Sequence, residues 1–206
     1  MLTAFTAALL LITISELGDK TFFIAVILAM RHSRRLVFIG ATAALAAMTV
    51  ISVLVGQAVS LLPQNYIHVA EIGLFFCFGF KLLYDAKQMP AKCDSEEAAE
   101  AAEAVDKARS LKWLPAGSKL AVVLKTFVLT FIAEWGDRTQ IATIALAASN
   151  NALGVTLGAI VGHAICAAIA VIGGRIIAGR ISERAIAALG GCLFLIFGTV
   201  AFLEGA

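Results

Sequence analysis

The sequence contains one unusual phrase twice: ELGDKT at residues 16–21 and EWGDRT at residues 134–139. Both copies follow the pattern E-x-G-D-[KR]-T, and every matched position is offset by 118 residues. Each copy places two carboxylates and a cation inside an apolar run that is long enough to cross a membrane. Ionisable side chains are costly in a bilayer and mark functional sites there. The duplication therefore predicts a chain of two related halves, with a site where the phrases lie.

The composition is typical of an integral membrane protein. Of the 206 residues, 61% are hydrophobic and only 15% are charged, whereas soluble domains carry roughly 25% charged residues. Such a chain has no room for a separate soluble domain. We predict an all-α membrane protein that has the lipid bilayer as its surroundings and no nucleic-acid partner.

Six apolar runs are long enough to cross a bilayer. They cover residues 2–30, 36–62, 67–83, 120–148, 152–178 and 185–203. These runs predict six transmembrane helices in two groups of three: a first repeat at 1–84, an acidic linker at 85–118 and a second repeat at 119–206. Because the first two runs are longer than a bilayer requires, we expect a tilt or a break within them.

The basic residues predict the orientation. Outside the two phrases, Lys and Arg lie in or beside the connection after the first helix, the central linker, and the connection between the fifth and sixth helices. The other two connections and both ends carry none. Because basic loops stay in the cytoplasm, we expect both termini outside it. The N-terminal run lacks a basic start and contains acidic residues, so we expect no cleaved signal peptide.

Three helices per half is an odd number, so the two halves enter the membrane from opposite sides. This arrangement is an inverted repeat, in which many secondary transporters form a substrate site at the midplane. Weaker echoes support the duplication, because Gly40 matches Gly158 at the same offset. Gly154, Gly158 and Gly162 also predict close helix packing. That packing belongs by preference to the core and alternatively to a dimer interface, so we expect a monomer or a homodimer.

The chemistry of the phrase suits a hard divalent cation. Its Glu and Asp are three residues apart and share a face on a helix, and its Thr adds a hydroxyl. Oxygen ligands without a nearby thiol suit Ca²⁺, Mn²⁺ or Mg²⁺ better than Zn²⁺ or Cu²⁺. Gly18 and Gly136 are candidate helix breaks, where the helix can open locally and free backbone carbonyls. The candidate metal ligands are Glu16, Asp19, Thr21, Glu134, Asp137 and Thr139.

Each phrase also carries a cation. Lys20 and Arg138 follow Glu16 and Glu134 by four residues, the favourable orientation for an ion pair within a helix. We expect them to balance the glutamates when no metal is bound; two cations against four carboxylates leave a formal charge of −2. Clustered carboxylates in a dry site favour their neutral form, so they can bind protons and a metal in alternation. The competing interpretation, a pair of structural salt bridges, is disfavoured by the duplication.

Other polar residues are weaker candidates. Gln140 directly follows the second phrase and has no polar counterpart after the first. His163 lies mid-helix in the fifth span and is a candidate proton shuttle or metal ligand, although we prefer a packing or hydrogen-bonding role. The acidic linker could concentrate or sense divalent ions, but we prefer to interpret it as a solvated connector.

The doubled phrase resembles the signature of the Gdt1 family, also called uncharacterised protein family UPF0016. Its hallmark is two copies of E-x-G-D-[KR]-[TS] in a six-helix membrane protein with a central hydrophilic loop. The resemblance covers essentially the whole chain, and it implies a transporter of Mn²⁺, and in some members of Ca²⁺, in exchange for protons. Bacterial members look like manganese exporters, and an N-terminus without a transit peptide fits the bacterial inner membrane. The family's acidic positions correspond here to Glu16, Asp19, Glu134 and Asp137.

We therefore predict a secondary transporter that exports Mn²⁺, with Ca²⁺ as a further substrate, in exchange for protons and without a permanent cofactor. The alternatives are a Ca²⁺/H⁺ antiporter with little Mn²⁺ transport, and a divalent-cation channel in which the carboxylates form a filter. An enzyme is not predicted, because no nucleophile, histidine-rich or phosphate-binding motif accompanies the acidic pairs.

Overall fold

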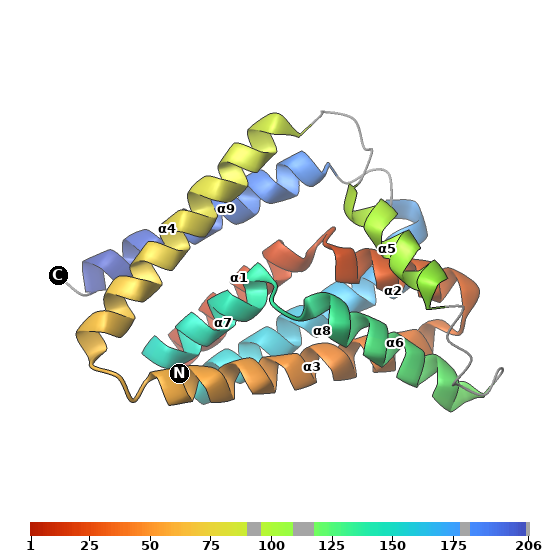
Figure 1. Cartoon of the computed structure of the whole chain (residues 1–206), viewed down its shortest axis with the longest axis horizontal. Coiled ribbons are helices and arrows are strands. Elements are labelled where there is room, and N and C mark those ends of the chain that lie inside the picture. The colour runs from red at the N-terminus through yellow and green to blue at the C-terminus, as the bar shows by residue number, and fades with distance from the viewer. Residues whose placement is uncertain (90–95, 109–117, 178–181, 205–206) are drawn as a thin grey trace.

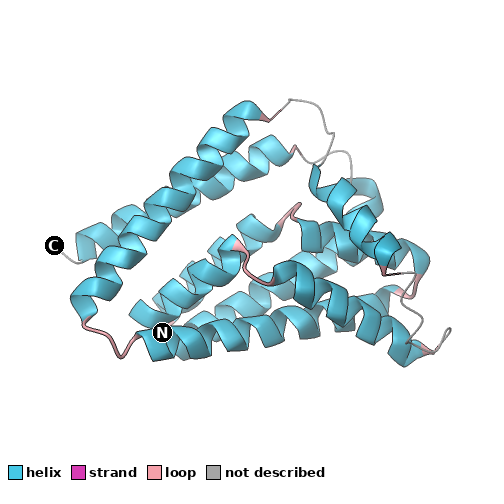
Figure 2. Cartoon of the chain, in the orientation of Figure 1, coloured by secondary structure: helices cyan, strands magenta, loops and turns pink. Residues whose placement is uncertain are grey.

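The computed structural model describes residues 1–89, 96–108, 118–177 and 182–204. Within these ranges the chain is built from helices joined by short loops, without strands (Figure 2). This confirms the predicted all-α class. The helices are α1 (Leu2–Glu16), α2 (Lys20–Arg31), α3 (Arg34–Val59), α4 (Gln64–Gln88), α5 (Glu96–Lys107), α6 (Lys119–Glu134), α7 (Arg138–Ser149), α8 (Ala152–Ile177) and α9 (Glu183–Glu204).

Four helices among the described residues are long and apolar enough to cross a membrane, namely α3, α4, α8 and α9. Helix α1 is also apolar but shorter, with 15 residues. At 1.5 Å per residue it spans about 22 Å of a hydrocarbon core that is about 30 Å thick. The helices therefore support a multi-pass membrane protein.

The first and fourth apolar runs are each divided into two helices. Helix α1 ends at Glu16 and α2 begins at Lys20, while α6 ends at Glu134 and α7 begins at Arg138. The second run, for which length predicts a tilt or a break, is the unbroken α3. Its glycines remain helical, whereas each motif glycine is followed by an aspartate at the N-cap position of a new helix. The local sequence, and not the length of the run, decides where a span breaks.

Helices α3 and α8 contact each other and hold the two broken spans. Helix α8 packs along α1, and α3 packs along α6 and α7. Helices α4 and α9 lie side by side and contact the other spans through α1 and α7. Figure 1 shows this pair diverging from the other helices toward the end of the molecule where α5 lies. The buried rings of Phe75 and Phe194 join the pair in the core.

Glycines bring the helix backbones close at two corresponding points. A side chain at Gly40 of α3 would lie 2.6 Å from the carbonyl oxygen of Val123 in α6. A side chain at Gly158 of α8 would collide with the carbonyl oxygen of Phe5 in α1. Gly154 and Gly162 face α1 as well, so this predicted glycine ridge packs inside the chain.

The acidic linker contains α5, which is docked against the protein and is not a solvated connector. Its Ala101 and Val105 are buried in the same cluster as Phe22 and Phe23 of α2. The expectation of a solvated connector weighed the charges of this segment but not the small apolar residues between them. Residues 85–88 of the predicted linker belong to α4, and 90–95 and 109–117 lie outside the described residues.

Candidate functional site

Both motif copies fold into the same broken helix. Gly18 and Gly136 have φ angles of 79° and 84°, the positive values found among the described residues. This left-handed backbone suits glycine and costs other residues about 1–2 kcal/mol. Each break lies between a glutamate that ends one helix and an aspartate at the N-cap position of the next. The Glu and Asp of one copy therefore do not share a helical face as predicted, because the helix between them is interrupted.

Three of the four motif carboxylates meet inside the protein. Glu16, Glu134 and Asp137 each contribute one carboxylate oxygen, and these three atoms lie within 4.8 Å of one another. Glu16 and Glu134 are each only 2% exposed. Residues that are 118 positions apart thus form one group, and its spacing allows a single cation to contact all three carboxylates.

The motif threonines position these carboxylates. Thr21 Oγ1 donates to Glu16 Oε2 at 3.2 Å, and Thr139 Oγ1 lies 2.8 Å from Glu134 Oε1. The Thr139 hydroxyl also lies 3.0 Å from Asp137 Oδ2, which accepts from the Thr139 backbone N–H at 3.1 Å. Asp137 therefore caps α7 and contacts the same threonine as Glu134. Both hydroxyl oxygens lie close enough to the carboxylates to join them around a cation.

Two carboxylate oxygens of the group are buried without a partner. Glu16 Oε1 and Glu134 Oε2 accept no hydrogen bond from the described residues. Burying such an atom unpaired is costly, and three neighbouring carboxylates also repel one another when ionised. A bound cation removes both costs, and so do bound protons. The group can therefore exchange one for the other.

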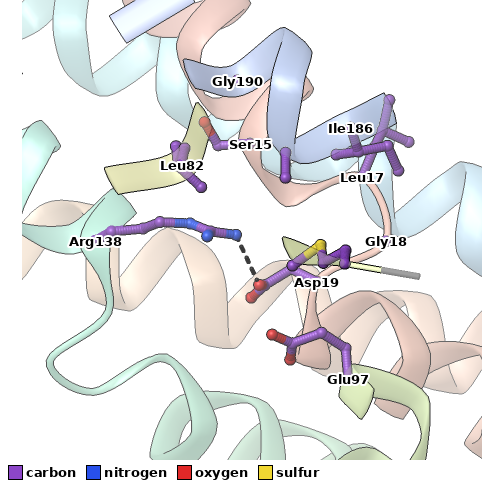
Figure 3. Close-up of a pocket in the computed structure, with 11 residues that line it drawn as sticks. Ser15, Leu17, Gly18, Asp19, Leu82, Glu97, Arg138, Ile186 and Gly190 are labelled. Atoms are coloured by element: carbon purple, nitrogen blue, oxygen red, sulfur yellow. Dashed lines mark hydrogen bonds and ion pairs between the residues drawn. The ribbon is translucent and has the colours of Figure 1, made fainter. Parts of the chain in front are cut away.

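The fourth motif carboxylate, Asp19, is held apart from this group. Arg138 donates from Nη2 to Asp19 Oδ1 at 3.1 Å. Figure 3 shows the guanidinium reaching Asp19 across the pocket. The side chain of Asp19 is only 11% exposed, so this ion pair is well shielded from solvent. It links the first motif directly to the second.

The motif cations have partners other than the predicted ones. Lys20 Nζ lies 3.0 Å from Glu100 Oε2 on α5, and Arg138 pairs across the halves with Asp19. The predicted pairs with the preceding glutamates require a continuous helix, which the glycine break removes. Lys20 is engaged with Glu100 and Arg138 with Asp19, so among the described residues neither motif cation forms an ion pair with the three grouped carboxylates. The formal balance of −2 for the whole phrase pair does not describe this group.

The two weaker candidates lie outside the carboxylate group. Gln140 accepts from the Gly136 N–H at 2.7 Å and donates to Met48 Sδ at 2.9 Å. Its side chain therefore links the backbone of the second break to α3. His163 is buried in α8, and its Nδ1 has no partner among the described residues. A ligand or proton-shuttle role for either residue stays a prediction.

One residue near the site was missed by the sequence analysis. Glu97 of α5 lines a pocket together with Asp19 and Arg138, and Figure 3 shows its carboxylate on the side of Asp19 away from the guanidinium. A signal for it exists, because Glu97 stands four residues before the buried Ala101 and shares its helical face.

The comparisons with known proteins agree with this geometry. The family model described as "Divalent cation/proton antiporter GDT1" matches residues 4–90 and 122–206. The chain belongs to this family. Its members are transporters, not enzymes, and both halves of the chain contribute to the match. The resemblance of the doubled phrase to the Gdt1 signature is thereby confirmed, and the function class is cation/proton transport across a membrane.

Three relatives show how far the similarity extends. The chain is 58% identical to a GDT1-like protein of Synechocystis sp. over 98% of both chains. It is 41% identical to GDT1-like protein 2, chloroplastic, of Oryza sativa over 97% of its own length and 61% of the relative's length. It is 40% identical to Protein PAM71-homolog, chloroplastic, of Arabidopsis thaliana over 97% of its own length and 59% of the relative's length. No solved structure matches the chain.

Proposed function

We propose that the chain is a secondary transporter that exports Mn²⁺ from the cytoplasm in exchange for protons, with Ca²⁺ as a further substrate. The observation that carries this proposal is the group of Glu16, Glu134 and Asp137, in which two buried glutamate oxygens have no hydrogen-bond partner among the described residues. Family membership supplies the antiport class, and the group supplies a place where cation and protons compete for the same atoms.

The proposed architecture is six spans in two inverted repeats. The first repeat is α1 with α2, then α3 and α4; the second is α6 with α7, then α8 and α9. The glycine contacts support it, because Gly40 meets Val123 while Gly158 meets Phe5. Both members of the second contact correspond to those of the first at the motif offset of 118 residues. Each half therefore packs on the other through equivalent positions.

The proposed orientation places the α5 end in the cytoplasm of a bacterium and the chain in its inner membrane. The end of α2, the start of α3 and the start of α6 lie at this end with α5 (Figure 1). They carry Arg31, Arg34, Arg35 and Lys119, as the rule for basic cytoplasmic loops requires. The start of α1 and the end of α9 lie at the opposite end, outside the cytoplasm (Figure 1).

The number of oxygens favours Mn²⁺ as the main substrate. One oxygen from each of the three carboxylates and the hydroxyls of Thr21 and Thr139 would supply five oxygens, one fewer than the six that an octahedral ion takes. Ca²⁺ takes six to eight oxygens, so it needs further ligands from backbone or water at this group. Zn²⁺ and Cu²⁺ are disfavoured because no thiol or imidazole belongs to the group among the described residues.

The proposed cycle uses these groups in turn. With the site open to the cytoplasm, Mn²⁺ displaces protons from the three carboxylates. The two halves then rock about the site, as inverted-repeat transporters do, and the site opens outward. Protons from outside reload the carboxylates and release the metal. Arg138 keeps Asp19 neutralised and holds the two breaks together while the cation is absent.

Transport by the purified protein in liposomes tests the proposal. With the membrane potential clamped, an imposed pH gradient should drive Mn²⁺ uphill, and protons should move in the opposite direction. The Glu16→Gln, Glu134→Gln double variant provides the matched inactive control. Mn²⁺ that moves only down its own gradient, independently of pH, would show a channel. Competition by Ca²⁺ in the same assay ranks the two metals and separates Mn²⁺ export from Ca²⁺/H⁺ antiport.

A further inference from the structure

Helix α5 forms an ion pair with each end of α2. At the first residue of α2, Lys20 Nζ lies 3.0 Å from Glu100 Oε2, and at the last residue, Arg31 Nη1 lies 3.1 Å from Asp106 Oδ1. Since α2 begins directly behind Asp19, the first of these ion pairs fixes the helix that leaves the first break. Docking of α5 therefore helps to fix where this half of the broken span lies, together with the contacts of α2 with α8, α6 and α3.

The contact that docks α5 on α2 has a small apolar part and two ion pairs. The buried apolar residues that α5 contributes to it, Ala101 and Val105, are small and remove little surface from water. Both ion pairs are partly exposed, and exposed ion pairs contribute little to stability and are screened by salt. A helix attached in this way can release without unfolding the membrane spans.

The same helix borders the pocket at the first break. Glu97 lines this pocket with Asp19 and Arg138, and α4 and α9 border it through Leu82 and Gly190. The pocket thus lies between the docked α5 and the α4–α9 pair. Any change in the position of α2 relative to that pair alters both the pocket and the first motif.

We propose that α5 is a latch on the transport site, closed by the Lys20–Glu100 and Arg31–Asp106 ion pairs, and that it must open in every transport cycle. The inference rests on the proposed function, because alternating access requires α2 to move against the rest of the chain. It also assigns a role to the motif lysine. Lys20 joins the first motif to a helix outside both repeats, and does not serve to neutralise its own glutamate.

A reversible cross-link between α5 and α2 tests the latch. In a background with the four cysteines replaced by alanine, Arg31→Cys and Asp106→Cys are introduced together. A reducible bifunctional thiol reagent then joins them, because a direct disulfide accepts only a narrow range of backbone separations whereas the reagent spans a longer gap. We expect Mn²⁺/H⁺ exchange in liposomes to fall to the level of empty vesicles and to return after reduction.

A second pair on the same helix is the matched control. Glu103 and Lys107 form an ion pair one turn apart within α5, and both are exposed. Cross-linking Glu103→Cys to Lys107→Cys places the same reagent on α5 without tying it to α2, and should leave exchange unchanged. If the α5–α2 cross-link also leaves exchange unchanged, α5 is a fixed support and the latch is refuted. If the cysteine-free parent and the uncross-linked variants show no exchange, the proposed transport function itself has failed.

Discussion

The two motif copies share one backbone and differ in what their charged side chains do. Both break at a glycine with positive φ, and in both the threonine contacts the glutamate five residues earlier. Asp137 caps α7 and joins the carboxylate group, whereas Asp19 makes no side-chain cap bond and is held by Arg138. A duplicated sequence has thus produced a symmetric frame around an asymmetric site.

The difference has a physical origin in the two cations. Arg138 has a planar fork of donors that suits a shielded carboxylate, and it reaches across to the other copy. Lys20 is a compact charge on a flexible stem, and it reaches out to α5. The exchange of Lys20 for Arg138 between the two copies therefore has a structural consequence. The arginine links the two copies inside the site, whereas the lysine contacts α5 outside it.

Removal of a glutamate charge should have the largest effect, and it should be equal in the two copies. Glu16→Gln and Glu134→Gln should each weaken Mn²⁺ binding about 100-fold, since a charge-assisted contact contributes up to about 3 kcal/mol. The dependence of the transport rate in liposomes on Mn²⁺ concentration measures this. Glu103→Gln, on the exposed face of α5, is the control and should leave the affinity unchanged. A large loss in one copy alone would contradict a shared group.

Removal of an aspartate charge should affect Mn²⁺ binding differently in the two copies. Asp137→Asn removes a member of the carboxylate group and should weaken Mn²⁺ binding about as much as the glutamate variants. Asp19→Asn removes a carboxylate that Arg138 already neutralises, and should cost only about tenfold. Parallel titrations of the two variants measure the ratio. Equal losses would show that all four carboxylates bind the metal alike, as the sequence pattern alone suggests.

Exchange of the cations should have smaller and again unequal effects. Arg138→Lys loses the fork geometry at a shielded carboxylate, and should lower the maximal exchange rate roughly fivefold. Lys20→Arg keeps a cation opposite Glu100 in a partly exposed pair, and should change the rate by less than about twofold. Initial rates at saturating Mn²⁺ compare the two. If Lys20→Arg were the more harmful change, the Lys20–Glu100 contact would matter more for transport than the Arg138–Asp19 bridge, which contradicts the roles assigned to the two cations.

The sequence predicted the helical segments better than the contacts among their side chains. Periodicity and length depend on neighbours in the chain, so the apolar runs and the phrase itself were found directly. The break at Gly18 and Gly136 was also accessible, because glycine before a capping aspartate is a local signal. The unbroken α3 shows that run length was the poorer guide.

The partners of the charged residues were not accessible in the same way. The four-residue rule that paired Lys20 with Glu16 holds only within one helix, and the break ends that helix between them. The contact of Lys20 with Glu100 joins positions 80 residues apart, and that of Arg138 with Asp19 joins positions 119 apart. Such contacts depend on how the helices pack, which no local pattern encodes.

The smallest expected effect concerns the feature that the copies share. Gly18→Ala and Gly136→Ala should each lower the stability of the protein by about 1 kcal/mol, because alanine is strained at positive φ. For a chain of this length the loss corresponds to a fall in Tm of roughly 2–4 °C, measured by thermal unfolding in detergent. Gly73→Ala is the matched control. Gly73 lies within α4, and like Gly136 it has no atom within 4 Å of an added Cβ.

The control isolates the backbone from the packing. Since neither Gly136→Ala nor Gly73→Ala meets a neighbouring atom, a difference in Tm between them reports the local backbone conformation, positive φ against helix, and not packing. Alanine favours a helix over glycine, so Gly73→Ala should not lower Tm. A Gly136→Ala variant as stable as Gly73→Ala would mean that the second span closes into a continuous helix at no cost. Glu134 and Arg138 would then share a helical face, and the asymmetry between the two copies would lose its structural basis.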